Sequence, residues 1–220
     1  MADLVAADPK ALRRRYGVVV ERTVQELRGI PCAELEQEAQ AKQQIICSRS
    51  FGERITQIGP MHQALAGYME RAAEKLRAEE QRCSHVTLFI RSSPFSEQET
   101  YYGNQISTRL QTPTSDTRDL LALIEPLLRR IWRDDVRYMK GGVMLADFTP
   151  MSMQQGDLFA PEQQSPRSEA LMQVIDKINQ GRLGKVYFAA RGIDRSEWMM
   201  KREQLSPRYT TCISEIPEAR

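Results

Sequence analysis

The sequence predicts an α+β fold in which a split β-α-β-β-α-β unit forms a four-stranded sheet with two helices on one face. Two stretches, residues 85–91 and 104–111, alternate apolar and polar side chains, as strands with one buried face do. Two apolar stripes with helical spacing lie between the expected strands. An N-terminal helix and a small C-terminal α/β appendage complete the expected fold.

The first element is expected to be one helix that begins after Asp8. Asp8 can cap it, Pro9 suits its first turn, and apolar residues recur at helical spacing at Leu12, Tyr16, Val20, Val24 and Leu27. Gly29 and Pro31 should end it. Residues 33–42 are polar and acidic without a strong apolar stripe, which is typical of a linker. A domain boundary is therefore expected near Lys42.

The first strand and first sheet-packing helix follow this linker. Residues 43–51, QQIICSRSF, mix apolar and small hydroxyl residues, and Gly52 is expected to close the strand. The helix is expected from about Pro60 to Gln81, with one apolar face formed by Met61, Leu65, Met69, Ala72 and Leu76.

The next two strands are expected to pair as neighbours. In residues 85–91, Thr87, Phe89 and Arg91 point away from the buried side, and in residues 104–111 the polar side includes Ser107 and Arg109. The polar connection between them contains Pro94 and ends at Gly103.

A second helix is expected from about Asp116, with an apolar stripe at Leu120, Ile124, Leu127 and Ile131. Pro126 should kink it. Residues 136–148 form the expected last strand, in which Gly141 and Gly142 indicate a bulge or a close backbone approach. After a Gln, Ser and Pro-rich stretch, a helical stripe returns at Leu171, Val174, Ile175 and Ile178, and residues 185–189 suit a short strand.

The composition excludes several classes of protein. The chain has 220 residues with a formal net charge of +2, and no apolar run approaches the roughly 20 residues of a membrane span. No secretory signal pattern opens the sequence, so a cytoplasmic, reducing location is expected. The four cysteines form no CxxC pair, and Cys83 with His85 falls short of a four-ligand metal set. We therefore expect no metal and no cofactor.

No catalytic residues are predicted. Asp134, Asp135 and Asp147 are the only aspartates near the ends of the last strand, and there is no Gly-rich phosphate loop. Nucleotidyl transfer would need carboxylates clustered around metal ions. A set of nucleophile, base and orienting acid for hydrolysis is equally absent from the pattern.

The candidate binding residues are Ser48, Arg49, Ser50, Arg91 and Arg109. Hydroxyl and guanidinium groups along a strand can contact phosphate oxygens without reading bases. If the three arginines share the open face of the sheet, they can grip a nucleic-acid backbone without sequence preference. The alternative is that they are unrelated surface arginines, since exposed arginine is common.

The segments KQQIICSRSFG and YMKGGVMLADFTP, with the β-α-β-β-α-β order, resemble the little-finger domain of Y-family translesion DNA polymerases. The endings GKVYFAARG and WMMKREQLSPRYTT resemble the branch of UmuC, MucB and RumB, the catalytic subunit of DNA polymerase V, and the similarity spans about Ala11 to Pro217. The resemblance implies a DNA-gripping role in error-prone SOS mutagenesis. The family's fingers and palm, which carry the metal-binding carboxylates, match no part of the sequence, so we expect this chain alone to lack polymerase activity.

The resemblance also implies a domain organisation and partners. Residues 1–32 correspond to the end of a thumb, 33–42 to a linker, 43–150 to the little finger, 151–167 to a flexible linker and 168–220 to a UmuC-type C-terminal module. Gln155, Leu158 and Phe159 resemble the peptide by which such polymerases dock on the β sliding clamp. A UmuD-type accessory dimer and RecA are further expected partners. For Trp198, Tyr187 and Phe188 a small packed cluster is expected rather than a ligand cage.

A second function stays open at this point. The chain could be a stand-alone adaptor or inhibitor that binds the clamp or the polymerase V accessory proteins without holding DNA. DNA affinity that falls with salt separates the two, because phosphate contacts release counterions.

Overall fold

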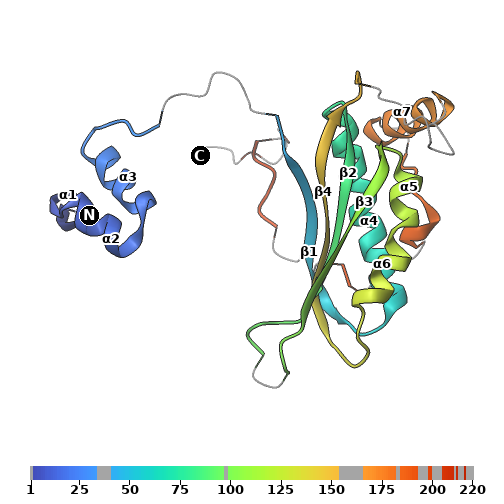
Figure 1. Ribbon diagram of the computed structural model, residues 1–220, viewed down its shortest axis with the longest axis horizontal. Coiled ribbons are helices and arrows are strands. Elements are labelled where there is room, and N and C mark those ends of the chain that lie inside the picture. The colour runs from blue at the N-terminus through green and yellow to red at the C-terminus, as the bar shows by residue number, and fades with distance from the viewer. Residues whose placement is uncertain are drawn as a thin grey trace. The chain divides into compact units, whose positions relative to one another are not determined.

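The computed structural model describes residues 2–33, 41–96, 99–153, 166–181, 184–192, 198–199, 205–210, 212 and 216 (Figure 1). The chain divides into two compact units, Met1–Ala41 and Lys42–Arg220. The clamp-like motif at Gln155, Leu158 and Phe159 lies outside the described residues.

The N-terminal unit contains three short helices, α1 (Ala2–Ala6), α2 (Pro9–Tyr16) and α3 (Val18–Leu27). The Asp8 side chain caps α2 by accepting a hydrogen bond of 3.1 Å from the Lys10 amide, as predicted. The prediction of one continuous helix is wrong, because Gly17 has φ +91° and separates α2 from α3. The Arg28 guanidinium donates to the carbonyl oxygens of Val5 and Ala7 at 2.5–2.8 Å and so ties α1 to the end of α3.

The second unit is built on a four-stranded antiparallel sheet. Its strands are β1 (Gln44–Ile55), β2 (Gln81–Arg91), β3 (Gly103–Thr114) and β4 (Tyr138–Pro150), in the order β1-β4-β2-β3. The predicted pairing of β2 with β3 is confirmed. Because β4 lies between β1 and β2, and β2 lies between β3 and β4, both crossovers are split βαβ units.

Helices cover one side of this sheet (Figure 1). They are α4 (Ile58–Ala78), α5 (Thr117–Ala122) and α6 (Ile124–Ile131). The predicted second helix is thus broken into α5 and α6 just before Pro126, whose ring and missing N–H disrupt the preceding turn. Asp116 caps α5 by accepting a hydrogen bond of 2.8 Å from the Arg118 amide.

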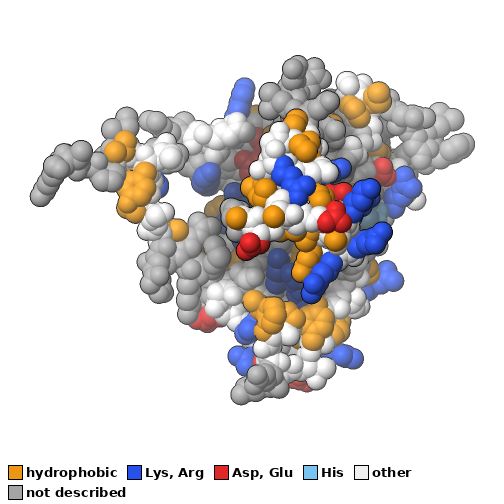
Figure 2. Space-filling view, turned by 90° about the vertical axis from the view of Figure 1, so that its left-hand side faces the viewer, with side chains coloured by type: hydrophobic (Ala, Val, Ile, Leu, Met, Phe, Trp, Pro, Cys, Tyr) orange, Lys and Arg blue, Asp and Glu red, His pale blue; other side chains and the backbone are white. Residues whose placement is uncertain are grey.

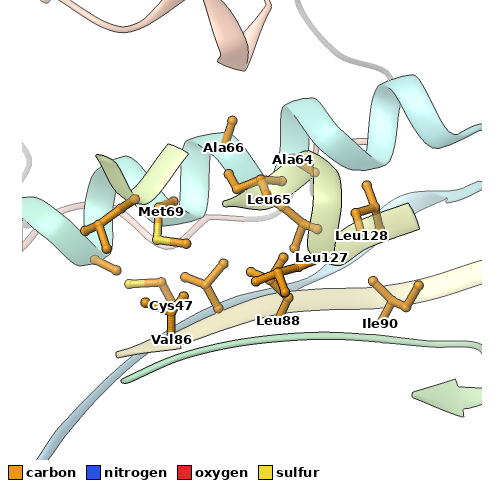
Figure 3. Close-up of a cluster of buried hydrophobic side chains, with 14 of the residues drawn as sticks. Cys47, Ala64, Leu65, Ala66, Met69, Val86, Leu88, Ile90, Leu127 and Leu128 are labelled. Atoms are coloured by element: carbon orange, nitrogen blue, oxygen red, sulfur yellow. The ribbon is translucent and has the colours of Figure 1, made fainter. Parts of the chain in front are cut away.

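The core lies between these helices and the sheet. Leu65 and Met69 of α4 face Val86, Leu88 and related side chains of the strands (Figure 3). These residues are almost fully buried, and burying each leucine or valine contributes about 1.5–3 kcal/mol relative to exposure. The period-2 burial of the strands therefore defines a core side and an opposite, open side of the sheet.

The C-terminal part of the unit contains α7 (Pro166–Gln180) and a 3₁₀ turn at Ala189–Arg191. Met172 is buried, whereas most of the predicted apolar stripe, at Leu171, Val174 and Ile178, is exposed. The predicted strand at residues 185–189 is wrong, since residues 185–188 are irregular. The Asn179 side chain bonds both backbone groups of Val186, which holds this segment beside α7 instead of in a sheet.

Candidate nucleic-acid interface

The open side of the sheet carries four cross-strand rows of residues that alternate with the buried positions. We call this surface the open face. From one end to the other, its rows are Gln44, Ala146, His85 and Arg109; Ile46, Met144, Thr87 and Ser107; Ser48, Gly142, Phe89 and Gln105; and Ser50, Lys140, Arg91 and Gly103.

The last row gathers two cations and a hydroxyl. Ser50 on β1 pairs with Lys140 on β4, which pairs with Arg91 on β2. Neighbouring strands lie about 4.8 Å apart, so the three side chains start within about 10 Å of one another. Ser50 and Arg91 are exposed, and Lys140 is half-buried. Within the described residues, the ion pairs involve neither Arg91 nor Lys140, which leaves both charges available to an anion.

Arg109 lies at the other end of the open face, about 20 Å away along the strands. Its Nη2 atom lies 3.0 Å from Oδ2 of Asp147. Asp147 has φ +56°, which turns its side chain away from the buried side that Leu145 shares. Both partners are largely exposed, so the pair contributes at most about 1 kcal/mol and a phosphate can replace the carboxylate.

Arg49 does not share this face. It pairs with Gly141, which pairs with the buried Ile90, so Arg49 belongs to the core side of the edge strand. Its charge acts there on Tyr68, whose pKa burial raises to about 12 while Arg49 lowers it in part. The prediction that three arginines share one face is therefore wrong for Arg49, because consecutive strand residues point to opposite sides.

Ser48 is on the open face but is half-buried. The ring of Phe89 lies over Gly142: a Cβ atom at Gly142 would be 2.5 Å from the Phe89 ring and 2.4 Å from Ser48 Cβ. The predicted close approach at this glycine is confirmed. Ser50 is consequently the more accessible of the two hydroxyls.

Sequence reasoning missed Lys140 as a member of this cluster. A signal was present, because Lys140 precedes Gly142 by two residues and the pattern of β4 puts both opposite the buried Val143 and Leu145. The pairing with Arg91 could not be found this way, since it depends on β4 entering between β1 and β2.

The C-terminal segment packs on the core side and at the β1 edge. Trp198 makes edge contacts with the rings of Phe51 and Tyr68, at centroid distances of 6.2 and 6.3 Å. Its carbonyl oxygen accepts a hydrogen bond of 3.0 Å from the Gly52 amide. Packing of Trp198 is therefore confirmed, whereas Tyr187 is largely exposed and lies against the Arg191 guanidinium.

Ion pairs hold α7 on the same side. The Arg77 guanidinium binds both carboxylate oxygens of Asp176, at 2.6 and 2.7 Å, and also donates to the Ser115 carbonyl and the Thr117 hydroxyl. Arg82 pairs with Glu169 at the start of α7. Each buried cation thus has an acidic partner on the helix.

Two cysteine thiols are buried and poorly reactive by position. Burial raises the pKa of Cys83 to about 12. Burial also raises the pKa of Cys47, against the opposing charges of Lys75, Arg71 and Arg49. In the described ranges no three His, Cys, Asp or Glu side chains gather as a metal site would require, and no helix is long and apolar enough to cross a membrane.

The fold and its uncovered face define an α+β domain of the split βαβ class, extended by a C-terminal segment that packs on its core side. The chain belongs to the impB/mucB/samB family: the model of the family's C-terminal domain matches residues 42–158. A domain of unknown function, DUF4113, matches residues 169–219.

Relatives match almost the whole chain. It is 52% identical to protein SamB of Salmonella typhimurium over 99% of its length. It is 48% identical to protein UmuC of Salmonella typhimurium over 97% of its length and 48% identical to protein MucB of Escherichia coli over 99%. The chain spans about half the length of these relatives, 51% in each case.

Proposed function

We propose that this chain is the non-catalytic, DNA-holding C-terminal part of an error-prone translesion DNA polymerase that acts in SOS repair and mutagenesis. Membership of the impB/mucB/samB family supports this role, together with the resemblance to the polymerase V branch. The work of such a polymerase is done on bacterial DNA, in the cytoplasm.

The row of Ser50, Lys140 and Arg91 is the observation that carries the proposal. It combines donors that bind phosphate oxygens with a surface that no described helix covers. Arg109 extends the cationic surface along the sheet, once Asp147 is displaced. These groups recognise phosphates and not base edges, so binding is independent of sequence.

The test is duplex binding over a series of salt concentrations, followed by fluorescence anisotropy. We expect Arg91→Ala with Lys140→Ala to weaken binding to unrelated duplexes alike and to reduce the salt slope by about 2, because each phosphate contact contributes about 0.9. Arg129→Ala with Arg130→Ala removes the same charge from the helix side of this unit and serves as the matched control. Equal slopes in the two double variants would exclude the open face as the DNA surface.

We further propose that Gln155, Leu158 and Phe159 dock on the β sliding clamp. Two apolar anchors and one amide suit a short peptide in a pocket, and each anchor of this kind contributes roughly 2 kcal/mol or more. Leu158→Ala with Phe159→Ala should abolish clamp binding and leave DNA affinity unchanged, whereas the exposed Met153→Ala nearby should change neither. Normal clamp binding by the double variant would assign the contact to another surface.

The alternative, an adaptor or inhibitor without DNA affinity, makes the opposite forecast for the first experiment. It requires binding to the clamp, a UmuD-type dimer or RecA, with no salt-dependent binding to duplex DNA by the unchanged chain.

A further inference from the structure

Two aromatic rings lie flat on the open face, each over a glycine. Phe89 lies over Gly142, and Tyr101 lies over Gly103: a Cβ atom at Gly103 would be 2.4 Å from the Tyr101 hydroxyl oxygen and 2.9 Å from Cζ. A side chain at either glycine would lift the ring off the sheet. The backbone is therefore arranged so that both rings can lie against it.

These rings form parts of the wall of an open depression of about 290 Å³. Its other side chains include Arg91, Asn104 and Gln105. The volume is at the lower limit of small-molecule sites, about 300 Å³, and suits one flat ring system. The exposed Gln105 amide can donate to and accept from the edge of such a ring.

The surroundings of the depression carry positive charge and further aromatic surface. Arg91 and Lys140 stand in the row next to Phe89, and Tyr101 is 53% exposed. Phe95, in the β2–β3 connection, is 88% exposed and outside the core. Figure 2 shows hydrophobic side chains gathered at the lower end of the molecule, beside Lys and Arg side chains, at the height where Figure 1 shows the β2–β3 connection.

Exposed rings beside cations are the combination that binds single-stranded nucleic acid. A base in a duplex is already stacked on its neighbours, so its flat face is not available to a protein ring. An unpaired base can stack on an aromatic side chain while its phosphate binds a cation. Phosphate contacts alone would not need Phe89 and Tyr101 to be held flat over glycines.

We propose that this depression, formed by Phe89, Arg91, Tyr101 and Gln105, binds an unpaired nucleotide of a DNA strand by stacking its base. The proposal rests on the proposed DNA-holding function and adds that the β2–β3 end of the open face holds single-stranded DNA. The rest of the face, towards Arg109, holds the backbone of a duplex.

The experiment compares three probes of equal length with the full chain: fluorescent oligo(dT), the same backbone with abasic sites throughout, and a duplex. We expect oligo(dT) to bind more tightly than the abasic strand. Tyr101→Ala should weaken oligo(dT) binding roughly 5- to 150-fold, the range of one lost base stack, and leave the abasic strand and the duplex unchanged. Tyr101→Phe should retain the wild-type preference because it keeps the ring.

Tyr209→Ala, at another exposed tyrosine in the C-terminal segment, is the matched control and should behave as wild type. Denaturant midpoints establish that each variant is folded. The stacking site is excluded if the unchanged chain binds oligo(dT) and the abasic strand equally, or if Tyr101→Ala leaves oligo(dT) binding unchanged or weakens both strands equally. Loss of duplex binding by the unchanged chain would refute the DNA-holding function instead, so the two failures are distinct.

Discussion

Gly142→Ala tests the packing of the open face with the smallest possible change. The added Cβ atom would be 2.5 Å from the Phe89 ring, 2.4 Å from Ser48 Cβ and 3.0 Å from the Cys47 carbonyl oxygen. The Phe89 ring can rotate, but Ser48 and Cys47 belong to the strand that pairs with Gly142, so β1 must also move. Overpacking of this kind costs about 1–3 kcal/mol.

A smaller effect opposes this cost. Replacing glycine by alanine restricts the unfolded chain and stabilises the native state by about 0.4–1 kcal/mol. The expected net result is therefore a loss of roughly 0.5–2.5 kcal/mol. Gly59→Ala is the matched control, because no atom lies within 4 Å of the position of its Cβ and it lies in the first turn of α4.

Urea denaturation followed by tryptophan fluorescence measures this difference. Both tryptophans, Trp132 and Trp198, belong to the second unit, so the signal reports the sheet and not the N-terminal helices. A Gly142→Ala midpoint equal to or above that of the unchanged chain would show that the row of Ser48, Gly142 and Phe89 is not tightly packed, and would refute the reasoning.

Three further predictions concern the core side. Asp176→Asn should lower the free energy of unfolding by about 3 kcal/mol, since it leaves the buried Arg77 charge without a carboxylate, whereas Glu125→Gln on exposed α6 should have no measurable effect. Burial raises the pKa of Asp116, but hydrogen bonds from Arg118 and Ser168 outweigh it and the net pKa is below 3.8; its stabilising contribution is thus present above about pH 4 and is lost as the pH falls further, and Asp116→Asn should flatten the acid limb of a stability profile. Native protein at pH 8 should react with a thiol reagent first at Cys32 and Cys212, with Cys47 and Cys83 reacting only on unfolding; rapid labelling of Cys83 would contradict its burial.

The sequence predicts the elements of the second unit well because their patterns are local. The buried positions of β2 alternate with Thr87 and Phe89 as expected, and α4 buries Met61, Leu65 and Met69 along one stripe. The misplacement of Arg49 was avoidable, because Cys47 and Phe51 on either side of it already indicated the core side. Strand alternation should have been applied residue by residue to SRS.

Other features depend on information that no local pattern contains. Gly17 fits an interior helical position by spacing, and only its φ of +91° breaks the helix. Asp147 joins the open face through an unusual backbone angle, φ +56°, that its residue type allows but does not require. The order of the strands follows from how two crossovers pack together, so the pairing of Lys140 with Arg91 emerges only in the folded sheet.

The C-terminal segment and the proposed DNA surface use opposite sides of the same sheet. Phe51, Tyr68 and Arg77, which contact Trp198 and Asp176, all lie on the core side or on the helices that cover it. Arg91 and Lys140 lie on the open face and share none of these contacts. Energies of changes at separate sites without shared partners usually add to within about 0.5 kcal/mol. Trp198→Ala should therefore destabilise the unit without changing the salt slope of DNA binding, and its combination with Arg91→Ala and Lys140→Ala should show the sum of the separate effects. A lower salt slope in folded Trp198→Ala alone would instead couple the C-terminal segment to the open face.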